Sequence, residues 1–177
     1  MSDRDPAPVV TARLRLEALA PATLEALLAG DRQAARRAHG RDLPDEFFDP
    51  GRHGFLEIQL ARMAARPSGR GWCARAMVRT DDGVVIGDCG FHGPPADVGR
   101  AEVGYMVLEP YRRRGYAVEA VGGLVDFARS EGEVAVFASV RPDNVASLAV
   151  VARLGFRPTG VQVDETDGEE LVFELAL

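Results

Sequence analysis

The stretch Tyr111-Arg112-Arg113-Arg114-Gly115-Tyr116-Ala117 decides how the rest of this chain is interpreted. It follows a predicted strand over residues 101–108 and precedes a predicted helix that runs from Tyr116 to Ala128. The first N–H groups of a helix lack intrahelical partners, and the helix dipole adds partial positive charge beside them. Gly115 lets the backbone approach an anion closely, and three arginines offer charge-assisted contacts. The turn therefore predicts a site for a phosphate-bearing ligand.

Three phosphate-binding patterns compete for this turn. Walker A requires Gly-x4-Gly-Lys-Ser/Thr, and the chain contains no lysine. The dinucleotide fingerprint is met only in degenerate form, by Gly115, Ala117 and Ala120. A third pattern, Arg/Gln-x-x-Gly-x-Gly/Ala, is matched by Arg112, Gly115 and Ala117.

The third pattern is the pyrophosphate loop of the GNAT superfamily of N-acetyltransferases, and its surroundings extend the resemblance. Glu102-Val103-Gly104-Tyr105 stands before the loop, and Asn144-x-x-Ser147-x6-Leu154-Gly155-Phe156 stands after it. Together they resemble the branch that contains the Rim-type ribosomal-protein N-terminal acetyltransferases. The resemblance is firm over residues 84–160 and thin over the first 70. A basic turn on an unrelated α/β domain is the alternative.

Composition bounds the class of protein. With 177 residues, 46% of them hydrophobic, the chain can bury the core of one domain. A net charge of −6 argues against nucleic acid or an anionic membrane as partner. Cys73 and Cys89 form no disulfide framework, and the three histidines show no metal-ligand spacing, so no metal is expected. Without a signal-peptide-like or membrane-spanning apolar run, a cytoplasmic location is expected, and a homodimer stays open.

The order of predicted elements is that of a single mixed α/β (α+β) domain over residues 9–177, after a disordered lead over residues 1–8. Strands are expected over residues 9–19, 72–80, 84–91, 101–108, 134–140, 156–163 and 171–175. Helices are expected over residues 21–30, 31–39, 55–66, 116–128 and 144–155. In the helix after the arginines, an apolar stripe leaves Gly122 and Gly123 on the opposite face, which predicts that both face solvent.

The resemblance implies a GNAT fold and names the residues that hold acetyl-CoA. In this superfamily a mostly antiparallel sheet splays between its fourth and fifth strands, and pantetheine enters the gap. An N–H group near Val107 would face the acetyl carbonyl as an oxyanion donor. Carried over position by position, the coenzyme-binding residues are Met106, Val107, Leu108, Arg112, Arg113, Arg114, Gly115, Tyr116, Ala117 and Asn144.

Two residues are candidates for the proton transfers. Glu102 matches the general base of the histone acetyltransferase branch, and partial burial is expected to raise its pKa. A strand-end charge that faces water or pairs with an arginine is the alternative. Ser147 matches a serine near the coenzyme sulfur and is the candidate acid, although a serine in a first helical turn is also ordinary.

These observations predict an acetyl-CoA-dependent N-acetyltransferase that acts by direct transfer in a ternary complex. The expected acceptor is a primary amine, most plausibly a protein or peptide N-terminal α-amine. Two alternatives stay open: acylation of a small amine, with acetyl-CoA or a longer acyl-CoA, and a coenzyme-A-binding module without turnover.

Overall fold

The computed structural model describes residues 6–95, 100–164 and 168–177. Its centre is an eight-stranded sheet in the order β1-β2-β3-β4-β5-β6-β8-β7, in which all neighbouring strands are antiparallel except β5 and β6. The strands are β1 (Val9–Val10), β2 (Leu14–Ala18), β3 (Ala74–Arg79), β4 (Val85–Phe91), β5 (Arg100–Val107), β6 (Ala135–Val140), β7 (Arg157–Asp164) and β8 (Gly168–Ala176). The predicted mixed, mostly antiparallel sheet is confirmed, and the predicted first strand is a short hairpin of β1 and β2.

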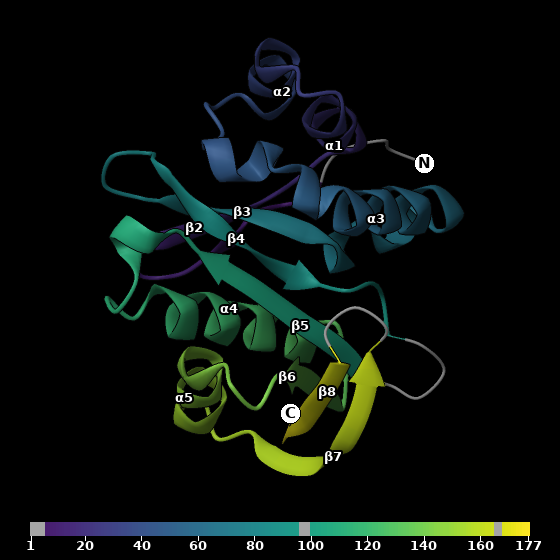
Figure 1. Cartoon of the computed structure of the whole chain (residues 1–177), viewed down its shortest axis with the longest axis vertical. Helices are drawn as coiled ribbons and strands as arrows, with labels where there is room; N and C mark the ends of the chain where they lie inside the picture. Colours follow the sequence, from purple (N-terminus) through teal and green to yellow (C-terminus); the bar gives the residue numbers. More distant parts are fainter. Residues whose placement is uncertain (1–5, 96–99, 165–167) are drawn as a thin grey trace.

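Helices cover both faces of this sheet (Figure 1). One face carries α1 (Pro21–Leu28), α2 (Arg32–His39) and α3 (His53–Ala65), and the other carries α4 (Tyr116–Ser130) and α5 (Val145–Arg153). Short 3₁₀ helices, Asp45–Phe48, Pro50–Arg52, Pro67–Trp72 and Glu109–Tyr111, connect them. Of the expected disordered lead, residues 1–5 lie outside the described part, and the carbonyl of Ala7 accepts a hydrogen bond from Arg75.

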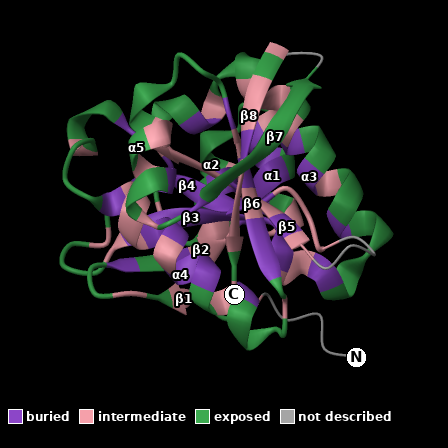
Figure 2. Ribbon diagram, turned by 90° about the horizontal axis from the view of Figure 1, so that it is seen from below, coloured by how far each residue is buried: buried purple, intermediate pink, exposed green. Residues whose placement is uncertain are grey.

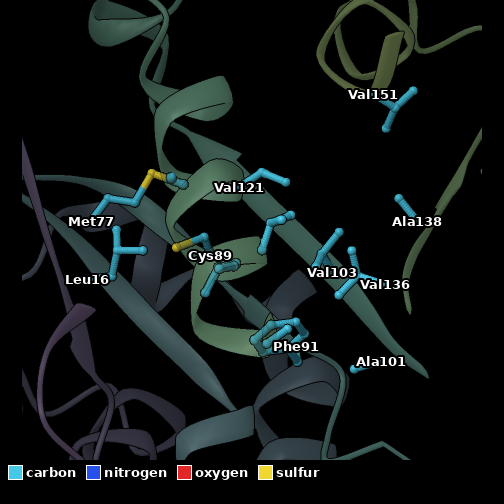
Figure 3. Packing of buried hydrophobic residues seen from close by; sticks show 14 of the residues in the cluster. Leu16, Met77, Cys89, Phe91, Ala101, Val103, Val121, Val136, Ala138 and Val151 are labelled. Atoms are coloured by element: carbon cyan, nitrogen blue, oxygen red, sulfur yellow. The ribbon is translucent and has the colours of Figure 1, made fainter. Parts of the chain in front are cut away.

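Two apolar clusters fill the space between the layers. The larger one joins the sheet to α4 and α5, with Leu16, Met77, Phe91, Val103 and Val121 among its buried members (Figure 3). The smaller one joins the other face to α1, α2 and α3. Burial is concentrated on the inner strands, whereas β7 at the sheet edge is exposed along its whole length (Figure 2).

Gly123 corrects one expectation about α4. Both glycines of this helix were predicted to face solvent, but Gly123 is buried beneath the β1–β2 hairpin. A Cβ at Gly123 would lie 2.8 Å from Thr11 Cγ2 and 3.4 Å from Val9 Cγ1. The glycine therefore allows the hairpin to cross the helix closely, a contact that the periodicity of the helix alone cannot reveal.

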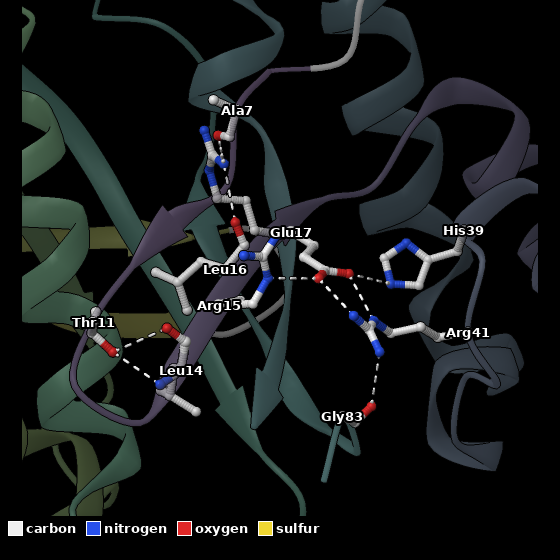
Figure 4. A network of polar contacts seen from close by, with 10 residues as sticks. Ala7, Thr11, Leu14, Arg15, Leu16, Glu17, His39, Arg41 and Gly83 are labelled. Atoms are coloured by element: carbon white, nitrogen blue, oxygen red, sulfur yellow. Dashed lines mark hydrogen bonds and ion pairs between the residues drawn. The ribbon is translucent and has the colours of Figure 1, made fainter. Parts of the chain in front are cut away.

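A polar cluster fastens the smaller layer to the sheet (Figure 4). Glu17 of β2 accepts hydrogen bonds from Arg41 Nε at 2.9 Å and Arg41 Nη2 at 3.0 Å, and Arg15 Nε donates to it at 3.2 Å. His39, whose side chain is 3% exposed, lies 3.9 Å away. Burial lowers the pKa of His39, and although Glu17 raises it, the net shift is downward.

Candidate functional site

The turn between β5 and α4 has the geometry of an anion cradle. Arg113 has φ +58° and Gly115 has φ +82°, so two of the three residues 113–115 occupy the left-handed region. Within the described residues, none of the backbone N–H groups of residues 113–118 has an acceptor. These donors stand at the start of α4, where the helix dipole favours negative charge. The turn therefore offers an arrangement of unpaired donors of the kind that the predicted phosphate site requires.

Arg13 supports this turn, a role that sequence reasoning missed. Its Nη1 donates to the carbonyl of Arg114 at 3.2 Å, and its guanidinium lies 4.6 Å from the ring centroid of Tyr116. Its Nε donates to Glu119 in the first turn of α4 at 2.7 Å. Arg13 lies about 100 residues before the loop in the sequence, so no local signal could have found it.

β5 and β6 separate just before this turn. Their parallel pairing covers only Arg100–Glu102 against Ala135–Phe137, and residues 103–107 are paired with β4 alone. The splay predicted between the fourth and fifth strands is therefore found between β5 and β6, which are numbered one higher because of β1.

The backbone direction alternates along β5. Glu102 O accepts from His92 N, and Leu108 N donates to Ile86 O, so even-numbered residues direct their backbone groups at β4. The backbone groups of Tyr105 and Val107 consequently face the gap. The carbonyl of Val107 accepts a hydrogen bond from Arg112 Nε at 2.8 Å. Among the predicted strand residues Met106, Val107 and Leu108, Val107 is the one whose main chain is directed at the gap between β5 and β6.

Glu102 is held by two neighbours from different elements. His92 Nδ1 lies 3.1 Å from its carboxylate, and Ser139 of β6 also hydrogen-bonds to it. Burial raises the pKa of Glu102 and is the largest single effect, but the hydrogen bonds from His92 and Ser139 and the charge interactions with His92 and Arg62 together outweigh it, so that pKa is lowered. The expected upward shift is wrong, because the sequence did not reveal these two donors.

Ser147 and Asn144 lie together at the start of α5. The side-chain oxygen of Asn144 accepts from Ser147 N at 3.1 Å, which confirms the predicted helix cap. Both line a hollow of about 470 Å³ at the end of β6, together with Ser139, Val140, Arg141, Asp143 and Glu170. The hydroxyl of Tyr105 donates to the carbonyl of Ser147 across the gap at 3.4 Å.

A second hollow, of about 190 Å³, lies on the face of β5 that α3 covers. Glu102, Gly104 and Met106 alternate onto this face, opposite the core residues Ala101 and Val103. The side chains that line it with Gly104 and Met106 include Arg52, Phe55, Asp88 and His92. The two side chains that hydrogen-bond to Glu102 line different hollows: Ser139 lines the first and His92 lines the second. Glu102 therefore lies between the two hollows. Sequence reasoning missed Arg52 and Asp88 and gave His92 no role.

The comparisons with known proteins agree with this geometry. The family model described as "Acetyltransferase (GNAT) domain" matches residues 13–157. The chain belongs to the GNAT acetyltransferase family. An uncharacterized N-acetyltransferase of Bacillus subtilis, YjdG, is 30% identical over 151 residues, which are 82% of this chain and 87% of that protein.

Solved GNAT structures share the fold across the whole chain. The ribosomal-protein-S5-alanine acetyltransferase of Vibrio fischeri superposes with a TM-score of 0.65 at 17% identity, covering 97% of each chain. Mycobacterium smegmatis RimJ, solved with CoA-disulfide, gives a TM-score of 0.58 at 20% identity, covering 97% of this chain and 90% of that one. This acetyltransferase thus resembles the Rim-type enzymes in fold.

No helix in its described part is long and apolar enough to cross a bilayer. No cluster of three or more metal-binding side chains occurs in that part.

Proposed function

We propose that this acetyltransferase moves the acetyl group of acetyl-CoA directly to a primary amine, and that the amine is a protein or peptide N-terminal α-amine. The observation that carries the proposal is the place of Glu102 between the two hollows. Ser139, one of its hydrogen-bond donors, lines the hollow at the end of β6, and His92, the other, lines the hollow beneath α3. A carboxylate in that place can serve an amine that meets a thioester from the opposite side of β5.

The turn at the end of β5 supplies what a pyrophosphate requires. The unpaired N–H groups of residues 113–118 would hold the phosphate oxygens, and the exposed side chains of Arg113 and Arg114 would reach the outlying charges. Pantetheine would enter the splay beside Val107, where Arg112 now bonds to the carbonyl. Met106 and Leu108 would contribute through their side chains, since their backbone groups pair with β4. Tyr116, Ala117 and Asn144 complete the proposed coenzyme site.

In the proposed reaction, the amine nitrogen attacks the thioester carbonyl. The new C–N bond forms, the C–S bond breaks, and the carbonyl oxygen carries negative charge that the N–H group of Val107 faces. The proton of the amine passes to Glu102, directly or through His92 or a water. The leaving thiolate takes a proton that the hydroxyl of Ser147 relays from water, so that the sulfur ends as a thiol and the serine as a hydroxyl; Ser147 lines the hollow at the end of β6.

The lowered pKa of Glu102 favours an α-amine over a lysine. A carboxylate with a lowered pKa is a weak base, so it serves an acceptor that is partly neutral already. From reference pKa values, roughly one α-amine in seven is neutral at pH 7, against about one lysine amine in 2,500. An N-terminal amine therefore depends far less than a lysine amine on deprotonation by a base of the enzyme.

Acceptor-dependent release of free thiol from acetyl-CoA tests the proposal. The acceptors are peptides with free N-termini, the same peptides with N-terminal blocking and a free lysine, and a set of small amines. We expect thiol release with the free N-termini and little with the blocked peptides. Equal turnover of the blocked peptides would contradict the α-amine assignment. Tight coenzyme A binding without thiol release from any acceptor would instead identify a binding module.

A further inference from the structure

The hollow beneath α3 has a second charged wall, which the proposed chemistry does not use. Asp88 of β4 stands opposite Met106 of β5 in the ladder, and its carboxylate lies 2.6 Å from Arg52 Nη2. Their side chains are 8% and 17% exposed. The free energy needed to remove two charges from water offsets most of the attraction between them. Such a buried pair therefore contributes little to the stability of the fold by itself. Its presence in the wall of a hollow points to recognition.

The local structure fixes the direction of Arg52. The carboxylate of Asp49 accepts a hydrogen bond from Gly51 N at 2.9 Å, which shapes the 3₁₀ turn Pro50–Arg52 that leads into α3. The guanidinium then lies near two aromatic rings, 5.2 Å from the centroid of Phe47 and 5.6 Å from that of Phe55. Cation–π contacts and the Asp88 carboxylate together hold the planar group in one orientation.

The guanidinium of Arg52 has more N–H donors than it has acceptors in the described part of the chain. Arginine carries five N–H donors, and in the described part of the chain its acceptors are Asp88 Oδ2 and the Met106 sulfur, 3.7 Å from Nη1. A thioether is a weak acceptor, so Arg52 can still donate to an oxygen that enters the hollow. Because Asp88 neutralises Arg52, the pair can offer a hydrogen bond without adding a net positive charge that would repel an amine.

The size of the hollow fits a small acceptor. Gly104 lies midway between Glu102 and Met106 on the face of β5 that lines the hollow. Gly104 has no side chain to fill the floor, and a Cβ there would lie 2.8 Å from His92 Nε2. A volume of about 190 Å³ equals roughly six waters at their share of liquid volume, which is room for one residue-sized group.

We propose that Arg52 donates a hydrogen bond to a carbonyl oxygen on the carbon next to the acceptor amine, and that Asp88 is the positioning residue for Arg52. The substrate class is then an α-amino carbonyl compound, as at a peptide N-terminus, and not an alkylamine or a lysine side chain. This inference rests on the proposed function and specifies that the enzyme recognises the carbonyl group next to the acceptor amine.

Two related acceptors test it. In both alaninamide and isopropylamine the amine-bearing carbon carries a methyl group, and alaninamide has a carboxamide where isopropylamine has a second methyl group. Arg52→Gln, whose amide can still donate to Asp88, should raise the KM for alaninamide by about tenfold or more with little change in kcat. The same variant should leave kcat/KM for isopropylamine within about twofold of wild type. Each acceptor is compared with itself, so the different amine pKa values cancel.

Two further variants separate recognition from folding. Asp88→Asn should show the same selective loss with alaninamide, whereas a merely structural role would impair both acceptors alike. Arg66→Gln, at the far end of α3, is the control and should resemble wild type with both. Coenzyme A affinity by calorimetry should be unchanged in all three variants.

The outcomes distinguish this inference from the proposed function. If wild type acetylates both amines but Arg52→Gln affects them equally or not at all, the Arg52 assignment is wrong and the acetyl-transfer assignment stands. If wild type releases no thiol with any amine while binding coenzyme A, the proposed function fails, and this inference with it.

Discussion

Arg13 and Glu119, which lie 106 residues apart in the sequence, are joined by two contacts of 2.7 Å between the guanidinium and one carboxylate oxygen. The other oxygen of Glu119 accepts from Arg13 N at 2.6 Å and from the hydroxyl of Thr11 at 2.7 Å. Burial raises the pKa of Glu119, but these hydrogen bonds outweigh burial and lower it. Since Arg13 also bonds to the carbonyl of Arg114, the residue that precedes β2 supports the turn that we propose binds pyrophosphate.

Removing this support should weaken coenzyme binding. We expect Arg13→Ala to raise the Kd for coenzyme A by about three- to tenfold, since a charge-assisted contact is lost at a partly exposed position. Isothermal titration calorimetry measures it. Arg15→Ala, two residues further along the chain in β2, with a side chain 44% exposed against 49% for Arg13, is the control and should bind normally. Equal affinities of the two variants would show that the turn holds its shape without Arg13.

Gly115→Val should abolish most coenzyme binding while the protein stays folded. The cost is one of backbone conformation, because a Cβ at Gly115 meets its nearest neighbour, Arg13 Nη2, only at 3.6 Å, whereas φ is +82°. Gly132→Val is a matched control, with φ +86° and nothing within 4 Å of its Cβ, but at the other end of α4.

Both glycine variants should lose comparable thermal stability in scanning calorimetry, about 1–2 kcal/mol. Only Gly115→Val should lose coenzyme A in titration. Wild-type affinity in a folded Gly115→Val protein would remove the pyrophosphate-turn assignment.

Glu102→Gln and Ser147→Ala should bind acetyl-CoA nearly normally yet lose kcat by about 10²-fold or more. The lowered pKa of Glu102 keeps its carboxylate ionised throughout pH 6–9, so the rise of wild-type kcat/KM in this range should follow the acceptor amine. Glu102→Gln should recover towards pH 9, where the amine loses its proton to solvent.

Ser147→Ala should show no such recovery, because its defect lies in the leaving thiolate. A pH–rate profile of the two variants beside wild type distinguishes these roles, with Ser130→Ala at the end of α4 as control. Full activity of Glu102→Gln from pH 6 to 9 would rule out Glu102 as the base.

Mild acid should destabilise the fold through His39. Its folded pKa lies below the ordinary value of 6.5, mainly because of burial, so the unfolded chain gains a proton first as the pH falls. The free energy of unfolding should therefore decrease as pH drops from about 7 to 5.5. Glu17, whose pKa is also lowered, adds a further loss at lower pH, since its contribution is present above 4.5 and disappears as the carboxylate is protonated.

Urea unfolding at several pH values measures this dependence. His39→Gln should flatten the profile between about pH 7 and 5.5, whereas His53→Gln at the first residue of α3 should keep the wild-type slope. An unchanged slope in His39→Gln would assign the acid sensitivity to other groups.

The sequence by itself determined the features that depend on near neighbours. The order of strand, turn and helix around Gly115, the cap of α5 by Asn144 and the left-handed Gly155 each depend on contacts or dihedral angles within a few residues. Spacing along the chain was therefore enough to predict them, and the family pattern added the splay between β5 and β6.

Only the tertiary structure decided which side chains share the site. The pairs Arg13–Glu119, Arg52–Asp88 and His92–Glu102 join elements that approach one another through the sheet register and the packing of helices on its faces. The same contacts reversed the expected pKa shift of Glu102, because desolvation can be judged from a strand's pattern but donors from distant elements cannot. Gly123 was misplaced for the same reason: the periodicity of a helix gives its faces, and only its packing shows that the β1–β2 hairpin crosses one of them.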